Sequence, residues 1–174
     1  MKILSKQKNS RMCMICGLDN EYGVNAPFYN MEDGSVMTVF RYKEQHQSYP
    51  GRVHGGMITA MLDEMGLRSL WAKELSEETF GVTISLDTKY RKPVPYETEL
   101  IGRGVVVKNT SHFIITDSYI MDKEGEILAN GRIKYIYYPL KTQKIQEGIE
   151  VHEEMPYLVE DGRTEIEGPF FDNL

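Results

Sequence analysis

The sequence has little of what marks membrane, secreted or nucleic-acid-binding proteins. No apolar run approaches the ~20 residues needed to span a bilayer, and the first residues lack the apolar centre of a signal peptide. The formal net charge is −6, and the 20 lysines and arginines form no dense patch. A basic patch is the usual signature of nucleic-acid binding. We therefore expect a cytoplasmic protein that binds neither membrane nor nucleic acid.

Cysteine is also scarce, because the 174 residues contain only two, in Cys13-Met-Ile-Cys16-Gly17. An isolated pair with this spacing is compatible with a redox pair or with half of a zinc site. No second ligand pair follows, and none of the four histidines has metal-ligand spacing relative to the pair. We expect a structural role for the thiols, with no metal and no cofactor. A metal shared between subunits and redox chemistry remain the alternatives.

The chain is long enough for one globular domain with a substantial core, since 41% of its 174 residues are hydrophobic. Residues 1–11 are polar and basic, and we expect them to be loose. Residues 140–174 hold many acids and two prolines. They are expected to form a C-terminal extension, with a short helix or strand at best, whose role the sequence does not show.

One apolar stretch organises the rest of the chain. A turn at Pro50-Gly51 and the glycines of His54-Gly55-Gly56 lead into a run that is apolar on nearly every side. The run predicts a buried helix that extends to about residue 75 and closes at 76–78. Its apolar members are Met57, Ile58, Ala60, Met61, Leu62, Met65, Leu67, Leu70 and Trp71.

Two acids interrupt this helix. Glu64 can pair with Arg68 four residues later, near an edge of the helix. Asp63 has no such partner within its own helix. A carboxylate in apolar surroundings is costly unless it is paired, hydrogen-bonded or used in chemistry, so Asp63 is a candidate catalytic residue. The N–H groups of Gly55 and Gly56, at the positive end of the helix, suit a developing oxyanion.

The residues after the helix change to a period of two. Phe80, Val82, Ile84, Leu86 and Tyr90 alternate with polar residues or glycine, which predicts a half-buried strand with this apolar set on one face. Together with the helix, the pattern predicts an α+β domain with one early strand and a four-stranded antiparallel meander. The other expected strands are 35–42, 97–108, 112–121 and 127–138, the first preceded by a hairpin strand at 28–31.

The helix entry resembles a known family. His54-Gly55-Gly56 followed after six residues by Asp63 resembles the signature of the PaaI-like acyl-CoA thioesterases, a branch of the hotdog-fold superfamily. The approach from Glu44 to Val53 is similar to the loop that precedes this signature. The resemblance covers roughly residues 12–138. It implies a sheet wrapped around the helix, an acyl-CoA substrate, and a homodimer or a dimer of dimers (homotetramer).

The resemblance also implies roles for the site residues. The N–H of Gly55 or Gly56 would polarise the thioester carbonyl, while Asp63 would act as nucleophile or as the base that activates water. Thr83 falls where related enzymes carry a Ser or Thr that orients the water or the carboxylate. His54 would orient the loop near the thioester, or simply cap the start of the helix.

The substrate-binding residues are less well defined. Several relatives place an Asn or Gln about six residues before the histidine, where this chain has Ser48 with Gln47 beside it. Lys89, Arg91 and Lys92 cluster at the end of their strand and are candidates for contacts with the CoA phosphates. Solvated surface charge is the competing interpretation of this cluster.

Helix geometry predicts that the site uses two chains. Gly55 and Asp63 are eight residues apart, which corresponds to about 12 Å along one helix at ~1.5 Å per residue. A partner helix could bring its own Asp63 beside Gly55. Two other functions remain open: a hydratase or dehydratase acting on enoyl or 3-hydroxyacyl thioesters, and a non-catalytic acyl-CoA-binding module. The acyl group is not predicted.

Overall fold

A long helix, α1 (Gly55–Ala72), forms the centre of the computed structural model, which describes residues 1–72, 79–139 and 155–168. The chain enters α1 from the turn at Pro50, and the N–H groups of Met57 and Ile58 donate to the carbonyl of His54. Of the helix residues only Gly56 is exposed, so the prediction of a buried helix is confirmed. The expected helix end at 76–78 lies outside the described residues.

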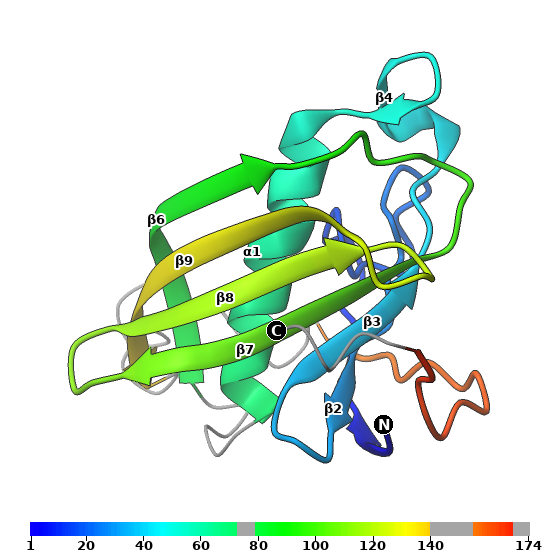
Figure 1. Ribbon diagram of the computed structural model, residues 1–174. Coiled ribbons are helices and arrows are strands. Elements are labelled where there is room, and N and C mark those ends of the chain that lie inside the picture. The colour runs from blue at the N-terminus through cyan, green and yellow to red at the C-terminus, as the bar shows by residue number, and fades with distance from the viewer. Residues whose placement is uncertain (73–78, 140–154, 169–174) are drawn as a thin grey trace.

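A seven-stranded antiparallel sheet curves around α1 (Figure 1). One long helix packed on a large antiparallel sheet is the hotdog arrangement, which confirms the α+β prediction. The strands in spatial order are β1 (Ile3–Lys6), β2 (Tyr29–Met31), β3 (Val36–Phe40), β7 (Leu100–Asn109), β8 (Ile114–Met121), β9 (Ile127–Pro139) and β6 (Thr79–Tyr90). A short turn, η1 (Glu44–His46), and a small ladder of β4 (Gln47–Tyr49) and β5 (Arg52–Val53) precede the helix.

The order of the strands differs from the expected meander of four. Strands β7, β8 and β9 do form a meander, but β6 pairs with β9 at the edge and β7 pairs with β3. The connection from β6 to β7 crosses beside the start of the helix, where Val94 is buried and its carbonyl accepts a hydrogen bond from Val53 N–H at 2.9 Å. The prolines that end β6 therefore open a crossover rather than a hairpin.

A β-bulge in β6 corrects the predicted face of this strand. Its register against β9 shifts between Thr83 and Ser85, so Ile84 is the extra residue. Before the bulge, Thr83 faces α1 while Val82 and Ile84 are 42% and 47% exposed. After the bulge the even-numbered residues face α1. The expected alternation was therefore wrong for the first half of the strand, because one inserted residue reverses the side-chain phase.

The N-terminal residues are not loose, as we had expected, but form an edge strand. β1 pairs with β2, and the N–H of Ile3 donates to Thr164 O at 2.9 Å. The described part of the C-terminal extension lies against this edge, with Ile166 only 2% exposed in a small apolar cluster. Residues 140–154 and 169–174 of that extension lie outside the described residues.

The side of α1 away from the sheet packs against the N-terminal loop. Cys16, Val24 and Phe28 from this loop share one core cluster with Met61 and Met65 of the helix. This packing places the cysteine pair directly beside α1. Within the described residues, no helix has the length and apolarity required to cross a membrane.

Candidate functional site

Asp63 is held by two hydroxyl groups that come from adjacent strands. Thr83 on β6 donates from Oγ1 to Oδ1 of Asp63 at 2.9 Å. The Tyr135 hydroxyl on β9 lies 2.8 Å from the Asp63 carbonyl oxygen and 3.1 Å from its Oδ1. Thr83 and Tyr135 are paired across the two strands, so the sheet presents both hydroxyls to one point of α1. The contact between Thr83 and Asp63 brings two predicted site residues together.

The surroundings of Asp63 favour its neutral form more than water would. Burial raises the pKa of this carboxyl above its ordinary value, and the charge of Glu64 adds to the effect. The hydrogen bonds from Thr83 and Tyr135 act in the opposite direction without cancelling it. No cation pairs with Asp63 within the described part of the chain. A raised pKa without a counter-ion is typical of carboxyls used in proton transfer.

The helix start contains the second group of predicted residues. The Nδ1 atom of His54 accepts a hydrogen bond from Gly56 N–H at 2.9 Å, so the imidazole caps the helix. Among the described residues, the N–H of Gly55 has no acceptor. Gly55 rather than Gly56 therefore offers a free donor at the positive end of α1.

Tyr90 covers this helix start and was not found by sequence reasoning. Its hydroxyl donates to Gly55 O at 3.1 Å and lies 2.7 Å from Oγ1 of Thr59. A Cβ added to Gly55 would lie 3.4 Å from the Tyr90 ring, so the ring already packs closely on this glycine. The even-numbered phase after the β6 bulge is what turns Tyr90 toward α1.

The other residues missed by the sequence analysis gave no local signal. Tyr135 belongs to a strand whose aromatic residues read as ordinary core. Glu64 was expected to pair with Arg68, and does so at 2.9 Å, but the Arg68 side chain is only 1% exposed. The pair is therefore deeply set rather than at an edge, and nothing within the helix sequence indicates the partner that faces Glu64 from the N-terminal loop.

The residues proposed to contact CoA lie at the periphery. Lys89 is exposed, whereas Arg91 donates to Asn130 at 2.7 Å and Lys92 forms an ion pair with Glu126. Surface pairing of this kind is the competing interpretation stated above, and it applies to two of the three cations.

Gln47 and Ser48 are exposed on β4, near the helix start. Gln47 borders a hollow of about 270 Å³ beside the His54 end of α1. Ser48 does not line it. The lining residues are Met14, Tyr22, Gln45, His46, Gln47, His54 and Met57.

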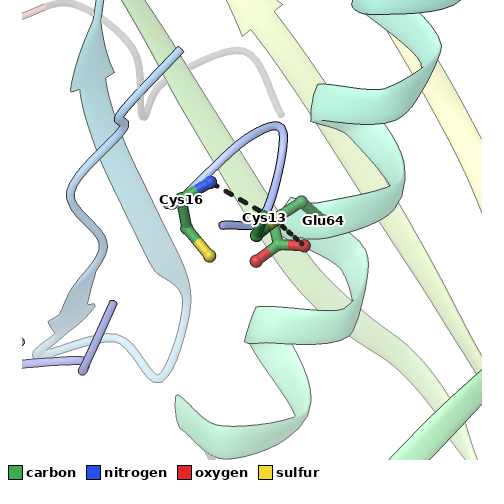
Figure 2. A group of neighbouring side chains, drawn as sticks. All are labelled: Cys13, Cys16 and Glu64. Atoms are coloured by element: carbon green, nitrogen blue, oxygen red, sulfur yellow. Dashed lines mark hydrogen bonds between the residues drawn. The ribbon is translucent and has the colours of Figure 1, made fainter. Parts of the chain in front are cut away.

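A separate cluster lies one residue further along α1, where Cys13, Cys16 and Glu64 meet (Figure 2). Hydrogen bonds from the Cys16 thiol and from backbone N–H groups lower the pKa of Cys13 to about 7, despite burial and the charge of Glu64. The hydrogen bond to Cys13, together with burial, raises the pKa of Cys16. Sequence spacing offered no third ligand for this pair, whereas the fold supplies Glu64.

Comparison with known proteins finds a family that the central segment of the chain resembles. Residues 50–129 match the sequence model of the thioesterase superfamily. This match covers less than half of the chain and shows that the segment is similar to the thioesterase superfamily. The segment carries the turn, all of α1 and strands β6 to β8, including Asp63 and Thr83. The resemblance to thioesterases described from the sequence is thereby confirmed. Tyr135 and the two cysteines lie outside the matched residues.

Individual relatives agree with this assignment. Human acyl-coenzyme A thioesterase 13 is 23% identical over 100 residues, which cover 57% of this chain and 70% of that protein. A solved thioesterase superfamily protein is 25% identical with a TM-score of 0.64, over 72% of this chain and 63% of its own. This chain therefore spans less than two thirds of that structure.

Two further solved structures share the fold at lower identity. A hypothetical thioesterase from Streptococcus pneumoniae, solved with coenzyme A, is 21% identical with a TM-score of 0.59, over 66% of this chain and 87% of its own. A phenylacetic acid degradation-related protein from Ralstonia eutropha is 18% identical with a TM-score of 0.58, over 65% and 85%.

Proposed function

We propose that this chain is a member of the thioesterase superfamily that hydrolyses acyl-CoA thioesters, with Asp63 as its catalytic carboxylate. The observation that carries the proposal is the arrangement of Asp63 itself. This carboxylate is held by hydroxyls from Thr83 and Tyr135 and has no counter-ion among residues 1–72, 79–139 and 155–168. The family match and the acyl-CoA thioesterase relative support the substrate class.

The two side-chain oxygens of Asp63 differ in their hydrogen bonds and therefore in their proposed roles. The side-chain donors Thr83 and Tyr135 both approach Oδ1, which leaves Oδ2 to react. As a general base, Oδ2 takes a proton from water, the water oxygen bonds to the acyl carbon, and the carbon–sulfur bond breaks. As a nucleophile, Oδ2 itself bonds to the acyl carbon, and water then hydrolyses the anhydride. In both routes CoA leaves as a thiolate that is then protonated.

The oxyanion donor in this proposal is the N–H of Gly55. The corresponding N–H of Gly56 is occupied by His54 in the resting structure. His54 therefore acts by capping the helix start and holding the loop, while Gly55 faces the developing charge. The His54–Gly55 peptide that carries this N–H is fixed through its carbonyl oxygen, which accepts hydrogen bonds from the N–H groups of Met57 and Ile58. Tyr90 holds the next peptide through Gly55 O. Donors fixed before the reaction stabilise an oxyanion more than donors that must reorient.

The complete site is proposed to need a second copy of the chain. Gly55 and Asp63 are about 12 Å apart along α1 at ~1.5 Å per residue, whereas both must lie about 3 Å from one carbonyl group. β6 offers the surface for a partner, because on its outer side it pairs with no strand in the described residues. Val82 and Ile84 are exposed there. A free twelve-residue edge is a template for antiparallel pairing with another copy. This pairing would give a homodimer, and two such dimers a tetramer.

The substrate would enter beside the helix start. Gln47 and Ser48 lie at this end of α1 and are proposed to contact the thioester arm. Lys89, which is exposed on β6, is the better of the three candidates for a CoA phosphate, since Arg91 and Lys92 already have partners. A cytoplasmic location and the absence of membrane or nucleic-acid partners remain expectations from composition.

The direct test measures thiol release from a panel of acyl-CoA thioesters of different chain length. A thiol reagent reports free CoA, and enzyme without substrate corrects for the two cysteine thiols of the protein. Hydrolysis of at least one thioester, with loss of activity in Asp63→Asn, is the expected result. Hydration of a crotonyl thioester without thiol release would identify a hydratase instead. Tight acyl-CoA binding without turnover would identify a binding module.

A further inference from the structure

The loop around the two cysteines is shaped to hold a thiolate. The N–H groups of Ile15 and Cys16 point at Cys13 Sγ, with N···S distances of 3.3 and 3.5 Å. The N–H of Gly17 donates to Cys13 O at 2.9 Å and closes the turn. A Cβ at Gly17 would lie 2.5 Å from the Cys13 backbone N and O, so only glycine fits after the second cysteine. Hydrogen bonds from amides to sulfur favour the charged form that binds metals.

Glu64 completes a set of three ligands around one point. The donor atoms of Cys13, Cys16 and Glu64 all lie within 4.8 Å of one another, and Cys13 Sγ is 3.9 Å from Glu64 Oε2 (Figure 2). In a tetrahedral zinc site, bonds of about 2.3 Å to sulfur and 2.1 Å to oxygen place these two donor atoms about 3.6 Å apart. The observed separation therefore needs an adjustment of only a few tenths of an ångström.

The Glu64 carboxylate is oriented from behind by Arg68. Nε of Arg68 donates to Glu64 Oε1 at 2.9 Å, while Oε2 faces Cys13 Sγ. The guanidinium is buried, donates to Lys8 O at 2.7 Å and lies over the Phe28 ring at 4.7 Å. Metal ligands are commonly oriented in this way by a fixed partner on the far side of the ligand.

We propose that Cys13, Cys16 and Glu64 bind a divalent zinc ion that ties the N-terminal loop to α1. Two thiolates and one carboxylate carry three negative charges, of which Arg68 offsets one and a divalent ion the other two. Thiolate donors select zinc over magnesium or calcium. Three protein ligands leave a fourth position for water. The metal would fix the helix at the residue that follows Asp63, and the proposal stands whether or not the chain hydrolyses thioesters.

The first experiment needs no substitution. The full-length protein, purified under reducing conditions, is expected to contain about one zinc ion per chain by elemental analysis. After removal of the metal with a chelator, titration with Co²⁺ should produce the thiolate-to-cobalt charge-transfer band and the visible bands of a tetrahedral site. Failure to retain zinc, together with no such bands on Co²⁺ titration, would overturn the proposal.

Substitutions then test the ligand set. Cys13→Ser with Cys16→Ser should abolish zinc binding, and Glu64→Gln should weaken zinc affinity at least ~10-fold. Glu124→Gln, an exposed acid on the β8–β9 turn, is the matched control and should bind zinc like the wild type. Equal zinc binding by all variants would place the metal elsewhere and exclude this site.

The competing redox interpretation gives a different result in the same protein. If the pair works as a dithiol, the purified chain contains no zinc and loses two hydrogen atoms in its mass on mild oxidation. A zinc site instead protects both thiols from alkylation until a chelator is added. Fast alkylation of zinc-treated wild-type protein, at the rate seen with chelator, would count against the metal.

Discussion

Asp63 and Glu64 are neighbours on α1, yet they face different surroundings. Glu64 is neutralised by the buried Arg68 and turns toward the cysteine loop. Asp63 turns toward the sheet and is held by the hydroxyls of Thr83 and Tyr135. The carboxylate of Glu64 is therefore already engaged by a cation. An acid held only by hydroxyls keeps its capacity to exchange a proton, so the neighbouring partners decide which of two adjacent carboxylates can react.

The largest expected effect comes from exchanging each acid for its amide. Asp63→Asn should lower kcat at least ~10²-fold, the usual scale for a positioned acid–base group, while the protein remains folded. Glu64→Gln should lower Tm and leave kcat within ~10-fold, because Glu64 contacts Arg68 and Cys13 rather than the hydroxyls that hold Asp63. Thiol-release kinetics measure kcat of the two variants, and thermal unfolding measures their Tm. Near-normal turnover by Asp63→Asn would remove the catalytic assignment.

The two-chain site predicts a recovery of activity on mixing. Asp63→Asn and Gly55→Pro, each inactive alone, are unfolded reversibly and refolded together so that subunits exchange. Half of the dimers should be mixed, each with one intact and one doubly damaged site, so roughly a quarter of wild-type activity should return. If the site lies within one chain, the mixture stays inactive even though a tag shows that mixed dimers have formed.

The hydroxyl that holds Asp63 should matter less than the carboxylate itself. Thr83→Val removes the donor to Oδ1 at nearly constant volume, and we expect kcat to fall about fivefold, as for the loss of ~1 kcal/mol from one hydrogen bond. KM should change little, because Thr83 orients the carboxylate rather than the substrate. Ser85→Ala, beyond the bulge on the same strand, is the control. A rise in KM with unchanged kcat would show that Thr83 contacts substrate instead.

Asp161, a carboxylate near the surface, has a third type of environment. The smallest effect is expected from its substitution. Burial alone would raise the pKa of Asp161, but hydrogen bonds from Lys6 and Tyr29 outweigh it and lower the pKa to about 2. Because the folded pKa is below the ordinary value of about 3.9, the stabilisation is present above that pH and is lost as pH falls toward 2.

Asp161→Asn should therefore lower Tm slightly at neutral pH, and the difference from wild type should shrink as the pH falls from about 4 to 2. Thermal unfolding across this range makes the measurement, with Glu160→Gln as the control. A difference in Tm that stays constant down to pH 2 would contradict the assignment.

Sequence reasoning singled out Asp63 as a candidate because a carboxylate without a partner in an apolar helix is unusual at the level of sequence alone. The helix and most strands were predicted because the spacing of apolar residues is a local property that the sequence shows directly. Sequence reasoning could not find Tyr135 or Tyr90, because a tyrosine in a strand has no sequence mark that separates core packing from a contact with one atom of α1. Glu64 was correctly paired with Arg68, but its approach to Cys13 depends on a loop fifty-one residues earlier.

The strand order of the sheet and the side-chain phase of β6 were not predicted, because both depend on contacts between residues that are far apart in the sequence. Pairing of β6 with β9 rather than β7 depends on how the crossover at Val94 packs against the helix start. The bulge at Ile84 is set by the ladder with β9. The N-terminal strand was missed because four polar-flanked residues carry little periodicity, and its pairing with β2 and with residue 164 is long-range.

The extra residue in β6 has a consequence for how this gene can change. An in-frame deletion of the codon for Ile84 would restore a regular pleat, with Thr83 still opposite Asp63 and with Thr88 and Tyr90 still facing α1. One more residue inserted between Thr83 and Tyr90 would instead reverse the phase and turn Tyr90 away from α1, which would detach the helix start from the strand without touching the carboxylate. Point substitutions leave the phase intact and loss of the bulge can take up a one-residue deletion, so a one-residue insertion is the change that the site should tolerate least.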